Sequence, residues 1–416
     1  MTSYARVALA LSIAAATVTT TVASMQSQAG DPGRLYGRVL TLDGEEYVGF
    51  LRWDTNEGHW TDHLDATKRL PRRHMREAER LSGDRYEEER AVRVFGIRIG
   101  SETNSRWTSS ASSVIRFGHI RQIEVLDDDH ALLVLKSGEE QELSSSSNDL
   151  GSGLVITVED ADQGDVEISW DDLDIVEFLP APARDARFGG RLHGTLTTRG
   201  GEEFTGWITW DRDEIYGVDE LDGDVNGRRR AVPFRNIAAI ERASSSRAYV
   251  TLHNGQELEM SGTNDVNSGN RGIFISDPGL GRVEVTWDEF REVRFHDPVA
   301  QNYGVFDGGR RLEGTVYATD GREYSGTIRW DNDEQWTWEG LDGGYQGLEY
   351  DVEFGLILSI ERVSENTSRV TLRDERVLLM RDSNDVNEDN KGIFIHSEDG
   401  EAVMLLWHEF DRVVFR

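Results

Sequence analysis

Acidic side chains recur in one fixed pattern at three places in the chain, and they are its first candidates for metal chemistry. The pattern W-D-x-[DN]-E-x4-[DE]-x-L-D, here called the W-D motif, spans residues 53–65, 210–222 and 330–342. Hard cations such as calcium bind sets of oxygen ligands, so carboxylates gathered in one short segment suit them, although the spacing is not that of an EF-hand. The candidate ligands are Asp211, Asp213, Glu214, Asp219 and Asp222 in the second copy, and Asp331, Asp333, Glu334, Glu339 and Asp342 in the third.

A purely structural role for the W-D motif is the favoured interpretation. An Asp followed three residues later by Glu resembles a capping box, in which both side chains satisfy free amides at a helix start. The Leu-Asp-Gly segments at 221–223 and 341–343 would then end a short helix on glycine. We therefore expect a capped helical turn after each motif tryptophan, with the tryptophan in the core.

A second polar element, N-D-V-N-x-x-N-[RK]-G-I-F-I, occurs at 264–275 and 384–395 and is here called the Asn-Asp loop. Asn and Asp offer oxygen ligands to a metal, but they also form turns by bonding their own backbone. The first copy keeps only Asn148-Asp149 of this element, so a metal role would be weaker or absent there. The candidate ligands are Asp265, Asn267 and Asn270, and Asp385, Asn387 and Asn390.

Catalytic patterns are absent from the sequence. It has no G-x-S-x-G, H-E-x-x-H, phosphate-binding loop or dinucleotide-binding glycine pattern, and three near-equivalent copies disfavour a single active cleft. His59 and His63 have a spacing that suits zinc, but the other copies lack both, which favours an ordinary surface pair. Trp60, Trp207, Trp336 and Trp338 lie outside the repeated landmarks and offer a second interpretation, as stacking platforms for a sugar or a cation, beside ordinary packing.

The chain repeats itself three times. Arg191-Leu192, Trp210-Asp211, Asn264-Asp265 and Trp287 all recur 120 residues later, and the same landmarks begin at Arg34-Leu35 in the first copy. A fixed period of this kind predicts tandem modules. We expect a signal peptide at 1–29, a first module at 34–179 with an inserted arm at about 67–107, a second module at 191–296 and a third module at 311–416.

Short β-branched and aromatic runs around Asp43-Gly44, Asn254-Gly255 and Asp320-Gly321 predict β-hairpins. Each module also contains two similar halves of about 55 residues, a size typical of small barrels and marginal for independent folding. The sequence therefore predicts an all-β protein of three tandem modules of antiparallel strands. Each module would be a pair of small SH3-like or Sm-like barrels, or a compact β-sandwich.

The inserted arm mixes charges of both signs, beginning with Lys68, Arg69 and Arg72 and continuing to Glu87-Glu88-Glu89. This composition is typical of a solvated helix or a partly disordered segment, which is the favoured interpretation. The alternative is that its basic residues dock on the acidic surface of another copy.

Composition limits the functional classes. The 416 residues carry 45 basic and 77 acidic side chains, a net charge of −32, which argues against nucleic acids and anionic lipids as partners. There is no cysteine, so disulfides and thiolate metal sites are excluded. The apolar segment after Arg6 predicts export to the periplasm or the exterior, with no membrane span after it.

These features favour a non-catalytic binding or structural repeat protein of the cell envelope, with calcium as the only cofactor suggested. The expected partner is a protein or a carbohydrate. A carbohydrate-active enzyme or carbohydrate-binding protein is the alternative.

Overall fold

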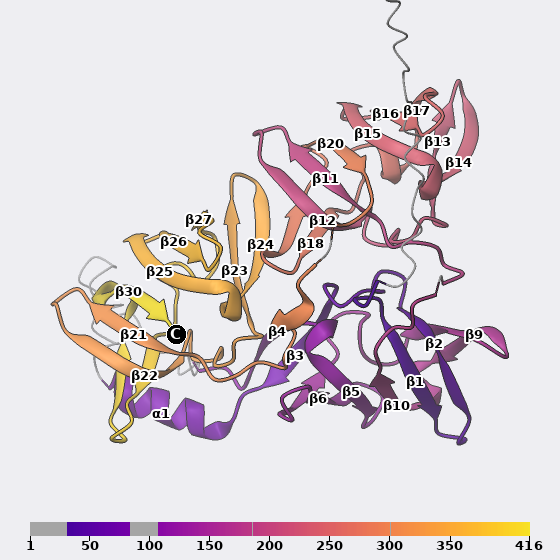
Figure 1. Ribbon diagram of the computed structural model, residues 1–416. Helices are drawn as coiled ribbons and strands as arrows, with labels where there is room; N and C mark the ends of the chain where they lie inside the picture. The colour runs from indigo at the N-terminus through magenta and orange to yellow at the C-terminus, as the bar shows by residue number, and fades with distance from the viewer. Residues whose placement is uncertain (1–30, 84–106, 185, 300) are drawn as a thin grey trace, which may run out of the picture.

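The computed structural model describes residues 31–83, 107–184, 186–299 and 301–416, and these fold into three antiparallel sheets of 10, 12 and 8 strands. The all-β prediction is confirmed. Figure 1 shows the paired strands β3 and β4 and the hairpin β23–β24 near the centre of the molecule. The signal peptide expected at 1–29 lies outside the described residues.

The described residues of the first module form one helix and ten strands. They are β1 (Tyr36–Thr41), β2 (Glu46–Trp53), β3 (His63–Arg69), α1 (Arg72–Ser82), β4 (Ser110–Arg116), β5 (Ile120–Val125), β6 (His130–Leu135), β7 (Glu140–Ser144), β8 (Val155–Asp160), β9 (Gly164–Ser169) and β10 (Leu173–Phe178). Single 3-10 turns, η1 (Phe117–His119) and η2 (Trp170–Asp172), precede β5 and β10.

The other two modules repeat this order. The second has β11 (His193–Thr198), β12 (Glu203–Thr209), β13 (Glu220–Val225), β14 (Arg228–Pro233), β15 (Ile237–Ser244), β16 (Arg247–Leu252), β17 (Glu257–Ser261), β18 (Ile273–Asp277), β19 (Gly281–Val285) and β20 (Phe290–Phe295). The third has β21 (Glu313–Ala318), β22 (Glu323–Arg329), β23 (Gly340–Tyr345), β24 (Leu348–Glu353), β25 (Ile357–Ser364), β26 (Thr367–Leu372), β27 (Val377–Met380), β28 (Ile393–His396), β29 (Ala402–Leu405) and β30 (Phe410–Phe415). The remaining 3-10 turns are η3 (Phe234–Asn236), η4 (Asn264–Val266), η5 (Tyr303–Val305), η6 (Phe354–Leu356) and η7 (Trp407–Glu409).

The hairpins expected at Asp-Gly and Asn-Gly form where the sequence places them. β1 pairs with β2, β16 with β17 and β21 with β22. Gly44, Gly255 and Gly321 have φ values of 85°, 82° and 87° at these turns. Glycine adopts this left-handed backbone without the steric cost that a side chain carries.

The first and second modules each consist of two five-stranded lobes that exchange strands between the two halves of the module's sequence. In the second module, β11 and β12 from the first half pair with β20 and β18 from the second half. Conversely, β16 and β17 from the second half pair with β15 and β13 from the first half. The lobes join along β15 and β20, and the first module has the same order. The two related halves therefore exist, but neither completes a sheet by itself.

The second and third modules share one sheet and one core. Hairpin β23–β24 belongs to the third module in sequence, yet β24 pairs with the edge strand β19 of the second, with Arg282 opposite Asp351. A continuous hydrophobic cluster runs through both modules. The first module has its own core, which Trp336 and Trp338 of the third module complete. The modules therefore form one packed body.

The described part of the inserted arm lies on the third module. Lys68, at the end of β3, reaches the third W-D motif, where its Nζ lies 2.7 Å from Glu339 Oε1 and 3.8 Å from both Asp333 and Glu334. Ala78 of α1 packs with Phe394 and other apolar residues of the third module. Lys68 thus meets carboxylates of another copy, as the docking alternative expects, whereas Arg73 of α1 faces Arg311 and Arg329. Residues 84–106 lie outside the described part.

Buried ion pairs join all three modules at one place. Arg116 of the first module is fully buried and binds Glu353 of the third through two bonds, with Nε 2.5 Å from Oε1, and donates to the carbonyl of Asp277 in the second. Beside it, Arg282 of the second module binds Asp351 at 2.6 Å and Asp65 of the first module at 3.0 Å. Burial would raise the pKa of Glu353, but Arg116 and His119 lower it to about 2. Within the described residues, no helix is long and apolar enough to cross a membrane.

The Arg116 to Glu353 pair should control cohesion of the three modules. Replacing Arg116 with Met leaves the buried Glu353 charge without its main partner, which should lower the free energy of unfolding by about 3 to 5 kcal/mol. Urea denaturation followed by tryptophan fluorescence measures this. The double variant Arg116→Met with Glu353→Gln should recover part of the loss, because no uncompensated charge remains. The exposed pair partner Arg322, changed to Gln, is the control and should shift the value by less than about 0.5 kcal/mol. Equal effects of Arg116→Met and Arg322→Gln would contradict this role.

Candidate functional site

The W-D motif forms a tight turn at the end of a strand, so the expectation of a capped helix is wrong. In the second copy, the backbones of Trp210 and Glu214 bond each other in both directions. Asp211 between them has a φ of 50°, a left-handed conformation that a helix start does not have. The Leu-Asp-Gly segment then enters strand β13. The motif tryptophans are fully buried, as expected.

One carboxylate organises each of these turns and also binds a cation from another module. Oδ2 of Asp219 accepts the backbone N–H groups of Ile215 and Tyr216, each at 2.8 Å. Its other oxygen, Oδ1, lies 2.8 Å from NH1 of Arg52 in the first module. The first and third copies use the same arrangement, with the pairs Asp62 and Arg191, and Glu339 and Lys68. These residues are therefore engaged in holding the modules together.

The Asn-Asp loop anchors the motif tryptophan and the following strand. Trp210 Nε1 donates to the carbonyl of Asp265 at 3.0 Å, and the Asp265 carboxylate accepts the N–H of Asp222 at 2.6 Å. The same two bonds recur through Asp149 in the first module and Asp385 in the third. Burial, with smaller contributions from neighbouring carboxylates, raises the pKa of Asp149 to about 7 and that of Asp265 to about 6.

The remaining asparagines of this loop make turns. Asn267 and Asn387 each accept a backbone N–H two residues later, and Asn270 and Asn390 do the same for Gly272 and Gly392. These are the local bonds of Asx turns. The structure thus gives every asparagine among the candidate ligands a structural bond, and their metal role stays a prediction.

The first Asp of the W-D motif binds a cation of its own module in the second and third copies. Asp211 is fully buried and accepts from the backbone and the guanidinium of Arg271, with NH2 at 2.9 Å. Asp331 is equally buried and is paired with Lys391, whose Nζ lies at 3.1 Å. Asp211, Asp213 and Glu214 bring carboxylate oxygens within 4.8 Å of one another. Arg271 lies at this cluster, because it also binds Asp213 at 2.5 Å.

The first module lacks this internal cation. Strand pairing places Ile156 opposite Trp53 and Phe274 opposite Thr209, which makes Leu154 the counterpart of Arg271 and Lys391. Leu154 is buried in the core. Within the described residues, neither Asp54 nor Glu57 forms an ion pair, whereas Asp211 and Asp331 do.

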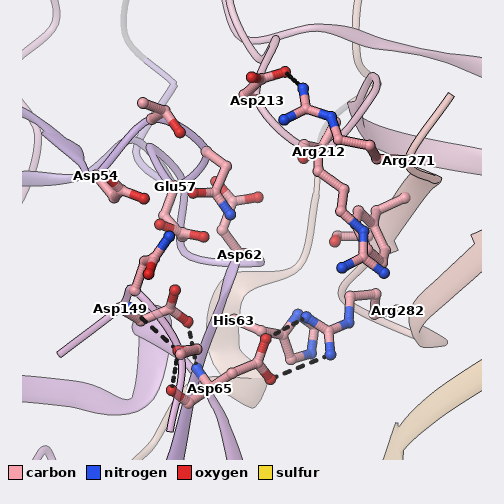
Figure 2. Close-up of a pocket in the computed structure, with 17 residues that line it drawn as sticks. Asp54, Glu57, Asp62, His63, Asp65, Asp149, Arg212, Asp213, Arg271 and Arg282 are labelled. Carbon is pink, nitrogen blue, oxygen red and sulfur yellow. Dashed lines mark hydrogen bonds and ion pairs between the residues drawn. The ribbon is translucent and has the colours of Figure 1, made fainter. Parts of the chain in front are cut away.

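A cavity of about 300 Å³ lies between this incomplete motif and the second module. Figure 2 shows carboxylates of the first module on one side and arginines of the second module on the other. Its charged lining consists of the carboxylates Asp54, Glu57, Asp62, Asp65, Asp149 and Asp213, and the guanidinium groups of Arg212, Arg271 and Arg282. The lining therefore carries an excess of negative charge.

Two buried groups of this pocket have no bonding partner. Glu57 is only 3% exposed, and its Oε2 bonds nothing in the described structure. Burial, followed by the charge of Asp149, raises the pKa of Glu57 well above its usual value. His63 is 6% exposed, with Nδ1 unbonded, and burial lowers its pKa, so its ring is neutral. The arginines are already paired, for example Arg212 with Glu284 and Arg282 with Asp65. Glu57 and His63 therefore remain without hydrogen-bond partners in a lining that holds more carboxyl groups than arginines.

The other residues singled out in the sequence have structural environments. His59 is fully buried and bonds Thr61 and Tyr303, so the expectation of a surface histidine pair is wrong. Trp207, Trp336 and Trp338 are buried, and Trp60 packs partly against the first core, which leaves no open tryptophan platform. Of the last residues of the W-D motifs, Asp222 is paired with Arg229 at the surface. Asp342 lies beside Asp351, and burial raises the pKa of Asp342.

Comparison with known proteins gives no relative: no family model, no curated protein and no solved structure matches this chain. Function therefore has to be inferred from the geometry alone.

The buried aspartates of the Asn-Asp loop should make the protein less stable as the pH rises from about 4 to 7. Their pKa values are raised from 3.8 to about 7 for Asp149 and Asp385 and to about 6 for Asp265, so the folded state holds these protons more tightly than the unfolded state does. Below about pH 4.5, stability should fall again as Glu353, with its pKa of about 2, loses its advantage.

Denaturant midpoints measured from pH 3 to 8 test this expectation. Asp265→Asn keeps an oxygen for the Asp222 amide and should reduce the loss of stability between about pH 4 and 6. The exposed Asp288→Asn is the matched control and should leave the profile unchanged. A wild-type protein that gains stability from pH 5 to 7 would refute the assignment.

Proposed function

We propose that this chain is a non-catalytic binding protein whose ligand is an organic cation, held in the pocket between the first and second modules. One observation carries the proposal. The position filled by the guanidinium of Arg271 and the ammonium of Lys391 is an apolar Leu154 in the first module. The W-D motif of that module lines the cavity with Asp54 and Glu57, and neither has an ion-pair partner among the described residues.

The chemistry of the internal cations indicates the class of ligand. Arg271 and Lys391 are a planar guanidinium and a primary ammonium, and both bind a W-D motif carboxylate. Burial keeps the Glu57 carboxyl protonated in the free protein, and a bound cation would favour its ionisation and pair with it and with Asp54. The cavity of about 300 Å³ accommodates a small guanidinium or ammonium compound, or a basic side chain of a protein partner.

The pocket favours an organic cation over calcium. Of the groups in the described residues that could hold a metal ion, only Asp211, Asp213 and Glu214 converge within 4.8 Å, and the carboxylates of the first module do not. Export to the periplasm or exterior, inferred from residues 1–29, would place this acidic binding protein in the cell envelope or outside the cell.

A second candidate function, a calcium-stabilised scaffold, is favoured by the cluster of Asp211, Asp213 and Glu214 itself. Glu214 Oε2 is buried without a partner, and burial together with Asp213 raises the pKa of Glu214. Calcium would have to displace the guanidinium of Arg271 from these oxygens. Three carboxylates supply only part of the oxygen shell of calcium, and water would complete it.

Binding of agmatine, which has a guanidinium and an ammonium group, tests the proposed function. Isothermal titration of the full chain should show one site, with affinity increasing as the pH rises through about 7 because Asp149 ionises. Glu57→Gln should weaken binding about tenfold or more, the loss expected for a charge-assisted hydrogen bond. The matched control is Glu214→Gln, the same motif position in the second module, which does not line the pocket. Absence of binding, or equal losses in both variants, would refute the proposal.

Calcium titration tests the second candidate independently. If calcium binds only the folded state, millimolar calcium should raise the melting temperature and a chelator should lower it. Asp213→Asn should abolish this shift, while Glu57→Gln should keep it. An unchanged melting temperature at millimolar calcium would remove the calcium candidate and leave the organic-cation proposal intact.

A further inference from the structure

A second pocket, of about 320 Å³, lies between helix α1 and the third module and has the opposite charge. Its lining includes Arg73 and His74 of α1, together with Arg311, Arg329 and His396 of the third module. Glu77 is the only carboxylate in the lining. In a chain with a net charge of −32, this is a concentrated patch of positive charge.

The equivalent arginines of the other two modules show which groups these positions can bind. Arg311 is the counterpart of Arg191, and Arg329 is the counterpart of Arg52, because each precedes or follows the same landmark residues. Arg191 binds Asp62 at 2.8 Å, and Arg52 binds Asp219 at 2.8 Å. Both of these carboxylates come from the W-D motif of the facing module. Arg191 and Arg52 thus hold carboxylates where the first and second modules meet, whereas Arg34, the first-module counterpart of Arg191, packs on the rings of Phe50 and Tyr216.

In the third module, the equivalent arginines face helix α1 and not a W-D motif. Helix α1 provides fewer carboxylates than these arginines could bind. Glu77 Oε2 lies 2.9 Å from Arg329 NH2, while its Oε1 bonds His396 at 3.0 Å. Arg329 is 4% exposed, yet its Nε bonds nothing in the described structure. Arg311 donates to the neutral amide oxygen of Gln335 and forms no ion pair within the described residues, and neither does Arg73.

The pocket is electrostatically poised for an anion. Burial lowers the pKa of Arg329, and repulsion from Arg73 and Arg311 lowers it further against the attraction of Glu77. Burial, with repulsion from Arg329, lowers the pKa of His74 to about 3, so its ring is neutral, and its buried Nδ1 is unbonded. A bound oxyanion would supply acceptors for these unused donors and compensate the excess charge.

We propose that the pocket between α1 and the third module binds a small oxyanion, a carboxylate in the first place, through Arg73, Arg311 and the unpaired Nε of Arg329. Guanidinium groups bind carboxylates in a planar two-bond geometry, as Arg116 does with Glu353. The side chains of Thr327 and Gln335 line the same pocket and add neutral hydrogen-bonding groups. This site is independent of the cation pocket, since they share no lining residue.

Titration of the full chain with citrate, glucuronate and inorganic phosphate, by calorimetry and by melting temperature, tests the inference. We expect saturable binding of at least one carboxylate, weakening with added sodium chloride. Arg73→Gln changes an exposed residue and should fold normally, and it should weaken binding about tenfold, the loss of one charge-assisted bond. Arg311→Gln should weaken it at least as much. Arg322→Gln, in an exposed ion pair of the same module, is the control and should bind as the wild type does.

Glu77→Gln separates ligand binding from a structural role. Removing the only carboxylate of the pocket should tighten anion binding, even though it removes an ion partner of Arg329. Binding of phosphate with no binding of either carboxylate would restrict the site to phosphate and overturn the carboxylate preference. No saturable binding of any of the three anions, or unchanged binding by Arg73→Gln and Arg311→Gln, would overturn the site itself.

Discussion

A shortage of positive charge governs how this molecule holds together. With 77 acidic and 45 basic side chains, most carboxylates have to stay in water, and each one that is buried needs a cation nearby or holds a proton, as the raised pKa of Asp149 shows. The W-D turns meet this need across modules: Asp62, Asp219 and Glu339 each use one oxygen to fix their turn and the other to bind a cation of another module. The contacts that pack the modules together are therefore the same contacts that neutralise the carboxylates of the W-D turns.

The two pockets lie where one partner of the repeated ion pairs is missing. In the first module the internal cation is replaced by Leu154, and in the third module the facing carboxylate is replaced by helix α1. A repeated architecture makes such departures informative, because the other copies show what the position normally holds. The proposed ligands, a cation in one pocket and a carboxylate in the other, follow from this comparison between copies and not from resemblance to another protein.

Local patterns in the sequence predicted the all-β class and the hairpins, since Asp-Gly and Asn-Gly turns are determined by the residues that form them. The tryptophans of the W-D motif were also correctly expected in the core. The helix after them was wrong, because the capping pattern does not reveal that Asp211 adopts left-handed backbone and that Asp219 collects the free amides. Strand exchange and both pockets depend on which distant segments meet, which no local pattern contains. Comparison of Leu154 with Arg271 and Lys391 was the one available signal for the cation pocket.

Strand exchange within a module has a consequence for how the chain acquires its structure. β11 completes its sheet with β20, about a hundred residues later, so the lobe closes only after nearly the whole module has been synthesised. Until then the β11–β12 hairpin has open edges, and the hairpin β21–β22 of the next module, which pairs in the same register, is a competing partner. Slow, error-prone maturation follows from such long-range closure. The residues that differ between the copies are then the ones that guide each strand to its own module.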